Sequence, residues 1–529
     1  MGKERLIVVV PAMNSRVEKW QPLVERLKRE PGCTAAEAEW YLHDQRTHGL
    51  GLKRLANLST ALVTAIQGKW VENGGFEEIW LLGHSLGGLV ARQAYMIGRG
   101  AEPGATQTHD WARAVTRIVL LAAPNRGVEK LPWHVRPLDW FLRIVPPFYN
   151  IPFTYRDLMR GSSFVTNLRI NWIRFFGVAT RRGERLPTVV QVLGTADSIV
   201  EESDSLDVMA FPNSLAFSIE GADHDEVQLL GKTPGAEARY RVLKGAILGD
   251  DLGVRPVERM TTVDTHRHVL FIYHGIRARR TDDWLERAEV AARAAYPDGV
   301  RTQRPEYGRV TARGFAMPGV RLRYIRYLQD HYTEELAQNP HAEFDFLGHS
   351  NGTFMLGESL KRIPGMCFRH VLVAGSVLPE DYAWDVAKRK KQVQEVRSDR
   401  GQKDWPVGWL CSALRHGLWM KDVGTGGYDG FTKGSVHEEK YHPGGHGGMF
   451  NDANIQRMAQ FLATGESGPE PANLCAELQW WGFVSRLLRY VPPLLIVGFV
   501  VALILLPTLT GKLILLLGAL IIYVLLNII

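Results

Sequence analysis

The sequence predicts an α/β protein with two successive parallel sheets, each covered by helices on both faces. Three observations lead to this prediction. Short apolar runs without polar alternation are typical of strands buried on both sides. Helical stripes separate these runs, as parallel β-α-β units require. The order of runs and turns then repeats in the second half of the 529-residue chain, which indicates an internal duplication.

The first predicted domain covers residues 1–250. It begins with an apolar run that is too short for a signal peptide and is therefore expected to be a strand. Further apolar runs alternate with helical patterns as far as the end of the domain. The predicted strands are 6–11, 79–83, 118–123 and 189–193, and the predicted helices are 52–71 and 86–95.

A polar linker over 251–266 precedes the second predicted domain, 267–463. Its predicted strands are 268–273, 344–348, 370–374 and 392–396, and its predicted helices are 323–338 and 352–361. Short turn sequences recur in the same order in both halves, which predicts a diverged duplication. The matched pairs are Pro11-Ala12-Met13-Asn14 with His274-Gly275-Ile276-Arg277, and Leu120–Pro124 with Val371–Gly375.

Two Gly-x-Ser-x-Gly pentapeptides, centred on Ser85 and Ser350, each follow an apolar run and precede a helical pattern. Roughly 0.3 chance matches to the bare pentapeptide are expected in a chain of this length, so two in the same context indicate function. A nucleophilic serine has to sit on a sharp, strained turn with its oxygen exposed. Flanking glycines allow the strand and helix of such a turn to approach closely.

A serine nucleophile needs a base, usually a histidine oriented by a carboxylate, and both are expected at later strand ends. In the first half, Asp197 directly follows the last predicted strand, with Asp204 and Glu201 as alternatives for the acid. His224 is the histidine available between His134 and the linker. The predicted first triad is therefore Ser85, His224 and Asp197.

In the second half, Asp404 is favoured over Asp399 because an apolar pair follows it closely, as in the loop after Asp197. His446 lies in a glycine-rich loop that suits a histidine leaning over Ser350, and His442 is the rival. The predicted second triad is Ser350, His446 and Asp404. The histidines that follow the acid are His416, His437, His442 and His446.

The oxyanion that develops during acyl transfer requires two positioned N–H donors. One donor is expected from the residue after each serine, Leu86 or Asn351. The other is expected from the turn after the first strand of each half. In the first half this is Met13, with Ala12 as the alternative, and in the second half it is Ile276.

These motifs resemble the α/β-hydrolase superfamily, and its serine esterases and lipases in particular. The resemblance covers about residues 5–235 and 268–450, as two copies. It rests on the serine turns, the acid and histidine loops, and the turn Ala123-Pro124-Asn125-Arg126-Gly127 after the strand that follows the first serine. It implies the fold, acyl-ester chemistry and no organic cofactor.

An aromatic-rich insert over about 128–171 is predicted to form a cap or lid. Two interpretations remain open: a cap packed on its own core, or a lid that opens to admit an acyl chain. Its aromatic residues are Trp133, Trp140, Phe141, Phe148, Tyr149, Phe153 and Tyr155.

Composition excludes some partners. The net charge is +7, and the basic runs lack interleaved aromatic residues, so nucleic acid is not expected as a partner. The four cysteines, Cys33, Cys367, Cys411 and Cys475, make no metal-binding spacing. We therefore expect no metal, while the absence of an organic cofactor is what the resemblance to the α/β-hydrolase superfamily implies.

The carboxyl-terminal region predicts a membrane segment. Residues 464–490 are expected to form a linker and an interfacial helix that carries Trp480, Trp481 and Tyr490. Apolar runs over 491–509 and 513–529 predict a transmembrane hairpin turning at 507–512, with one span plus a re-entrant piece as the alternative. The prediction is thus a multi-pass membrane protein whose catalytic domains face the cytoplasm.

The functional prediction is a membrane-anchored serine ester hydrolase that acts on lipid esters, with the bilayer and an ester substrate as partners. One alternative is a deacylase of lipid-modified proteins or thioesters. Another is a membrane scaffold in which one or both hydrolase domains do not turn over substrate.

Overall fold

The computed structural model shows two compact units, formed by Met1–Asp264 with Gln329–Pro340 and by Thr265–Leu328 with His341–Ile529. The structure describes residues 3–12, 15–44, 53–105, 107–130, 135–137, 139, 153–201, 204, 211, 213–230, 235–249, 266–275, 283–305, 307, 315, 318–417, 419–438, 440–488, 490–505, 508, 511, 513 and 516–518.

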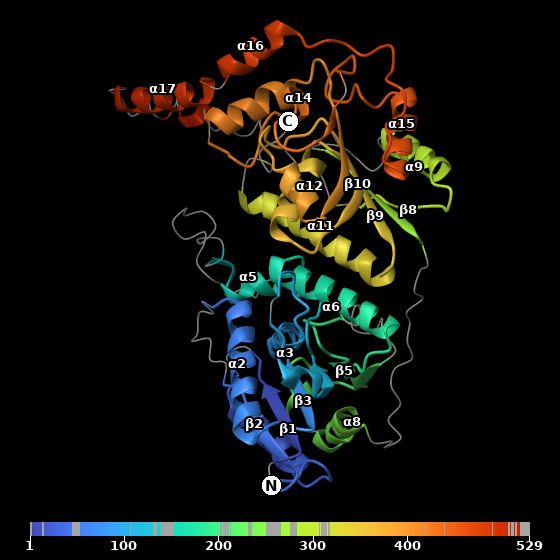
Figure 1. Ribbon diagram of the computed structural model, residues 1–529. Helices are drawn as coiled ribbons and strands as arrows, with labels where there is room; N and C mark the ends of the chain where they lie inside the picture. The colour runs from blue at the N-terminus through green and yellow to red at the C-terminus, as the bar shows by residue number, and fades with distance from the viewer. Residues whose placement is uncertain are drawn as a thin grey trace. The chain divides into compact units, whose positions relative to one another are not determined.

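The first unit contains a six-stranded sheet in the order β2-β1-β3-β4-β5-β6. Figure 1 labels strands β1, β2, β3 and β5 of this sheet. All neighbouring strands in it are parallel. The predicted apolar runs form its interior, which confirms the α/β class with a parallel sheet. The strands are β1 (Arg5–Val10), β2 (Ala38–Leu42), β3 (Glu78–His84), β4 (Val115–Leu121), β5 (Thr188–Gly194) and β6 (Ser214–Ile219).

Helices cover both faces of this sheet, because successive strand residues point to opposite sides. Helices α1 (Gln21–Leu27) and α8 (Ala236–Leu248) share one core with Val119 and Leu121 of β4. On the other face, Gly88 of α3 (Leu86–Gly98) approaches Leu120. Helix α3 also packs against two helices next to it, α2 (Leu55–Asn73) and α6 (Ser163–Arg181), and α6 contacts α5 (Thr154–Leu158).

The second unit contains another six-stranded parallel sheet, in the order β12-β11-β10-β9-β7-β8. Helices α9 (Asp283–Ala295) and α15 (Asp452–Thr464) build one core against it, and α12 (Asn351–Arg362) packs on β9. The strands are β7 (His268–Tyr273), β8 (Arg301–Gln303), β9 (Glu343–His349), β10 (Phe368–Ala374), β11 (Val393–Asp399) and β12 (His437–Glu438).

Shorter helices and one long helix complete the described secondary structure. Helix α11 (Pro318–Gln338) is divided between the two units, its residues from Gln329 onward grouping with the first. Two π-helical segments, η6 (Pro406–Cys411) and η7 (Ala413–Gly417), follow Asp404. The others are η1 (Val17–Trp20), η2 (Asp110–Arg113), η5 (Glu226–Gln228), α13 (Trp384–Arg389), α14 (Gly426–Asp429), α16 (Gln479–Leu488) and α17 (Val491–Leu505).

The two sheets repeat one topology, since β8-β7-β9-β10-β11-β12 matches β2-β1-β3-β4-β5-β6 strand for strand. Equivalent hydrogen bonds fix the register: Ser85 N donates to Leu121 O, and Ser350 N donates to Ala374 O. Sequence comparison paired Ala374 with Ala123, two residues later than Leu121. Uniformly apolar strands carry little register information, which explains the difference.

The predicted transmembrane hairpin over 491–529 is wrong, and so is the predicted multi-pass membrane localisation. Within the part of the chain that the structure describes, no helix is both long enough and apolar enough to span a bilayer. Helix α17 has 15 residues, which at 1.5 Å per residue is about 22 Å, against about 30 Å of hydrocarbon. The second predicted span, 513–529, lies mostly outside the described residues.

Several predicted features fall on positions that the structure does not describe. The linker is among them except for its last residue, and so are five of the seven aromatic residues of the insert. The other two, Phe153 and Tyr155, pack with Val135 and Met159 in a small apolar cluster. The predicted domain and insert boundaries stay predictions.

Gly87→Ala is expected to destabilise the first unit by about 1–3 kcal/mol, because a side chain there overpacks the turn. A Cβ at Gly87 would lie 2.1 Å from the carbonyl oxygen of Val10. Gly68 is the matched control: it lies inside α2, and a Cβ added there would meet no heavy atom within 4 Å. Gly68→Ala is expected to stabilise by about 0.5–1 kcal/mol. Urea unfolding of both variants measures the difference, and equal effects would contradict the packing described.

Candidate active site

Both pentapeptide serines occupy a backbone conformation that residues with side chains rarely adopt. Ser85 has φ 53° and ψ −125°, and Ser350 has φ 51° and ψ −116°. Such strain costs of order 1–3 kcal/mol per residue and persists where the surrounding structure enforces it. Each serine lies between a central strand and a helix, β3 and α3 or β9 and α12, as the strand-turn-helix arrangement of a nucleophilic serine requires.

In the first unit the structure brings the three predicted residues together. His224 Nε2 lies 2.8 Å from Ser85 Oγ, and His224 Nδ1 lies 2.8 Å from Asp197 Oδ2. The residues follow β3, β5 and β6, whose carboxyl ends share one edge of the parallel sheet. This is the geometry in which an imidazole can accept a serine proton while a carboxylate orients its ring.

The Asp197 carboxylate is buried and fully hydrogen-bonded. Oδ1 accepts the backbone N–H groups of Ile199 and Val200 at 2.8 and 3.0 Å, while Oδ2 accepts the N–H of His224. Burial by itself raises the pKa of Asp197, but these hydrogen bonds outweigh it and hold the pKa below its usual value. Asp197 is therefore an anion that can stabilise an imidazolium.

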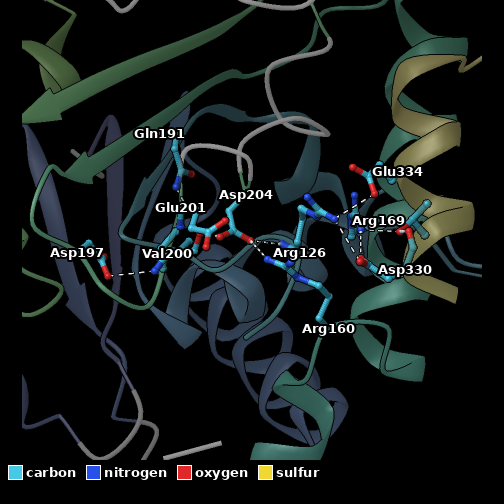
Figure 2. Close-up of polar contacts among 12 residues, drawn as sticks. Arg126, Arg160, Arg169, Gln191, Asp197, Val200, Glu201, Asp204, Asp330 and Glu334 are labelled. Atoms are coloured by element: carbon cyan, nitrogen blue, oxygen red, sulfur yellow. Dashed lines mark hydrogen bonds and ion pairs between the residues drawn. The ribbon is translucent and has the colours of Figure 1, made fainter. Parts of the chain in front are cut away.

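The alternative acids from the sequence take other places. Asp204 accepts hydrogen bonds from the backbone N–H groups of Glu201 and Arg126, at 2.9 and 3.3 Å (Figure 2). The carboxylate bonded to His224 is that of Asp197. Burial raises the pKa of Asp204 to about 6 despite the opposing N–H of Glu201 and charges of Arg160 and Arg126.

A residue that the sequence reasoning missed is the histidine before each serine. His84 is fully buried, and its Nε2 lies 2.9 Å from the carbonyl oxygen of His224. Burial lowers the pKa of His84 to about 4, so the ring is neutral and its Nε2–H donates this bond. In the second unit His349 Nε2 bonds His446 O in the same way, at 3.1 Å. The repeated His-Ser pair was the signal that could have identified both residues.

In the second unit the predicted acid and base are paired. His446 Nδ1 lies 2.8 Å from Asp404 Oδ2, and these residues follow β11 and β12, the counterparts of β5 and β6. Ser350 is only 4% exposed, whereas Ser85 is half-buried. Between the described residues Ser350 and His446 themselves the structure has no hydrogen bond.

The rival residues Asp399 and His442 form a separate buried group. Asp399 accepts two hydrogen bonds from Arg397 and one from Asn454, and His442 Nε2 lies 3.9 Å from Asp399 Oδ2. Burial raises the pKa of Asp399, but the charges of Arg397 and His442 and the hydrogen bonds from Arg397 and Asn454 together outweigh it and lower the pKa. This carboxylate is used in packing β11 against α15 and not at His446.

The predicted oxyanion donors are described in part. Leu86 and Asn351 are the first residues of α3 and α12, where backbone N–H groups have no partner within the helix and are available to a ligand. Met13 and Ile276 lie outside the described residues. Across the described residues, no group of three or more histidine, cysteine or acidic side chains could hold a metal ion.

The parallel sheet of the first unit and the contacts of His224 with Ser85 and Asp197 have the geometry that serine hydrolysis uses. Comparison with family models agrees: residues 7–232 match the model described as the α/β hydrolase family. This part of the chain, which is less than half of the 529 residues, is therefore related to the α/β hydrolase family. No curated protein sequence matches the chain significantly.

Solved structures of hydrolases resemble about half of the chain at low identity. A monoacylglycerol lipase of Paleococcus ferrophilus is 18% identical with a TM-score of 0.31, over 46% of this chain and 94% of that one. A lipase-esterase related protein from Clostridium acetobutylicum is 12% identical with a TM-score of 0.29, over 46% and 95%. The lipase BlEst2 of Bacillus licheniformis is 13% identical with a TM-score of 0.27, over 42% and 86%.

The buried, neutral state of His84 predicts a pH-dependent contribution to stability. Because its pKa in the folded protein is about 4, below the unfolded value of about 6.5, its contribution is present above pH 6.5 and is lost as the pH falls toward 4. The free energy of unfolding of the wild type, minus that of His84→Gln, should fall by up to about 3 kcal/mol over this range. Urea titrations, with hydrogen exchange of first-unit peptides as the readout, measure this difference in unfolding free energy. A difference that does not vary with pH would refute the buried, neutral state of His84.

Proposed function

We propose that the first unit is a serine ester hydrolase in which Ser85 is the nucleophile, His224 the base and Asp197 the orienting acid. The observation that supports this role is the continuous hydrogen-bonded series from Ser85 Oγ through His224 to Asp197, with both distances 2.8 Å. The nucleophile is activated by an adjacent base, and the base is held in one tautomer by a buried anion.

In this mechanism His224 Nε2 takes the Ser85 proton as Oγ attacks the ester carbonyl carbon. The resulting oxyanion accepts hydrogen bonds from Leu86 N–H and, by the sequence prediction, Met13 N–H. The imidazolium, stabilised by Asp197, gives the proton to the alcohol as it leaves. The acyl group stays on Ser85 Oγ as the acyl-enzyme. Water then attacks the acyl carbonyl carbon and gives a proton to His224. His224 passes this proton to Ser85 Oγ as the acid is released.

The proposed substrates are lipid esters. Support comes from the described part of the insert, where Val135, Phe153, Tyr155 and Met159 gather their apolar side chains. Met159 pairs with Val128 just after the turn at the carboxyl end of β4, so this apolar cluster lies on the segment that leaves this edge of the sheet. Thioesters of acylated proteins contain the same acyl carbonyl and are the alternative substrate class.

We also propose a second centre in the second unit, with Ser350 as nucleophile, His446 as base, Asp404 as acid and the N–H groups of Asn351 and Ile276 as oxyanion donors. Its support is the His446–Asp404 pair at 2.8 Å, at strand ends equivalent to those of the first centre. The competing hypothesis is a binding or scaffold domain without turnover, which the burial of Ser350 favours.

Ser85→Ala is expected to abolish most hydrolysis by the first centre, by at least about 10³-fold, because the acyl-enzyme can no longer form. Initial rates on a series of p-nitrophenyl esters from acetate to palmitate, compared with the matching thioesters, measure both the loss and the acyl preference. The control is Ser163→Ala, a serine in the first turn of α6. Undiminished hydrolysis by Ser85→Ala, Ser350→Ala and the double variant alike would rule the proposal out.

A fluorophosphonate probe separates two active centres from one. Intact protein is expected to take two adducts, with Ser85→Ala and Ser350→Ala each losing one, because only an activated serine reacts at phosphorus. Ser350 should react more slowly, since it is more buried than Ser85 and lacks the hydrogen bond to its histidine. Mass spectrometry of the intact chain gives the count, and one adduct confined to Ser85 would establish the scaffold hypothesis for the second unit.

A further inference from the structure

We propose that Asp204 is a positioning residue for the first centre: it ties the loop that carries Asp197 to the turn after β4 and so keeps the Asp197 carboxylate aligned on His224. This inference rests on the proposed function of the first unit. It concerns a carboxylate that has no contact with the reacting atoms and acts through another residue.

The first part of the loop after β5 is held by two carboxylates, those of Asp197 and Asp204. Asp197 bonds the N–H groups of Ile199 and Val200, and Asp204 bonds the next N–H along the chain, that of Glu201 (Figure 2). Three successive backbone donors are thus fixed by two side chains. Glu201 O also accepts the N–H of Asp204 at 3.0 Å, which closes the turn.

The second oxygen of Asp204 connects this loop to a different part of the fold. Oδ1 accepts Arg126 N–H at 3.3 Å and lies 4.0 Å from the Arg160 guanidinium. Arg126 belongs to the turn Ala123-Pro124-Asn125-Arg126-Gly127, which the sequence singles out and which takes no part in the proposed chemistry. The contact gives that turn a role.

The turn is rigid enough to act as an anchor. Asn125 accepts a hydrogen bond from Arg92 at 2.8 Å and donates one to Gln191 at 3.0 Å, all three side chains being buried. Gln191 lies on β5, the strand that leads to Asp197. The loop and its anchor are therefore connected at both ends, by β5 on one side and by Asp204 on the other.

The side chain of Arg126 extends this anchor to α11. Its guanidinium lies 3.2 Å from both Asp330 and Glu334, and Asp330 also pairs with Arg169 of α6 at 3.0 Å (Figure 2). These ion pairs compensate the charge of the Arg126 guanidinium and attach the turn to α11 as well as to Asp204. All of these residues belong to the first unit.

The charge state of Asp204 fits this role at neutral pH. Its side chain is 1% exposed, and burial raises its pKa to about 6, opposed by the N–H of Glu201 and the charges of Arg160 and Arg126. Above pH 6 the ionised carboxylate can accept from both backbone donors, which are charge-assisted hydrogen bonds. The charged groups that act on it are the guanidinium groups of Arg160 and Arg126, while Glu201 contributes its backbone N–H.

The test is Asp204→Asn in the full chain, assayed for Ser85-dependent ester hydrolysis. An amide has only one oxygen, so it cannot accept the N–H groups of Glu201 and Arg126 on two separate oxygens as the carboxylate does. The loop should therefore become more mobile, and the Asp197 carboxylate should be less well aligned on the His224 ring. We expect kcat to fall about tenfold with KM nearly unchanged, as for small misplacements of a reacting group. The acidic limb of the kcat/KM profile should shift to lower pH, because Asp197 then stabilises the His224 imidazolium less.

A double-mutant cycle distinguishes positioning from general destabilisation. Asp204→Asn should have little further effect on hydrolysis in an Asp197→Asn background, because both changes remove the same interaction. Glu220→Gln is the matched control: an exposed carboxylate on the first residue after β6, expected to leave kcat and the pH limb unchanged. If Asp204→Asn does not fold, Asp330→Asn replaces it in the test. The acidic limb of its kcat/KM profile should also shift to lower pH, by a smaller amount.

An Asp204→Asn enzyme with the kcat and acidic limb of the wild type would overturn this inference, and so would losses that multiply in the double variant. Neither result would touch the proposed function, which fails separately if wild-type hydrolysis does not depend on Ser85. Rates are referred to the amount of Ser85 that reacts with a fluorophosphonate, so a reduced folded fraction cannot imitate a positioning effect.

Discussion

The strained turn between a central strand and the following helix is the constraint on which the rest of each unit depends. Ser85 and Ser350 hold nearly the same positive φ, and each backbone N–H is bound by the last residue of the next strand. A glycine two residues later lets the helix pack against the first strand, since a Cβ at Gly87 or Gly352 would meet a carbonyl oxygen at 2.1 or 2.5 Å. The turn therefore fixes where strand, helix and hydroxyl lie, and the acid and histidine loops only have to reach it.

Much of this arrangement could be predicted because the interior strands and the serine turns have strong local signals. The edge strands β2, β6, β8 and β12 could not, because they are short or carry polar residues, as strands paired on one side often do. The apolar carboxyl-terminal runs misled the prediction, since apolar composition alone says nothing of where a helix ends. Helix α17 ends at Leu505 after 15 residues.

The polar contacts around the first centre were less predictable than its three principal residues. Asp197 and His224 were found from their order along the chain and from the scarcity of histidines. His84 and Asp204 act, in the geometry described, through backbone groups of His224, Glu201 and Arg126. A backbone N–H or carbonyl exists at every position, so the sequence has no mark for which of them a buried side chain will meet. Such partners become visible only when tertiary structure brings distant segments together.

The two units use one scaffold differently at the point where serine meets histidine. In the first, Ala122 follows β4 with φ 45°; in the second, the equivalent Gly375 has φ 49°, and a Cβ there would lie 3.0 Å from His446 Cε1 and 3.2 Å from Asp404 Oδ2. A glycine at this position lets the acid–base pair sit closer to the strand end than an alanine would. In the second unit, His446 and Asp404 are hydrogen-bonded to each other, while Ser350 is buried and has no hydrogen bond to His446. The divergence lies in how the histidine loop approaches the turn, and not in the turn itself, whose dihedral angles the two copies share to within 9°.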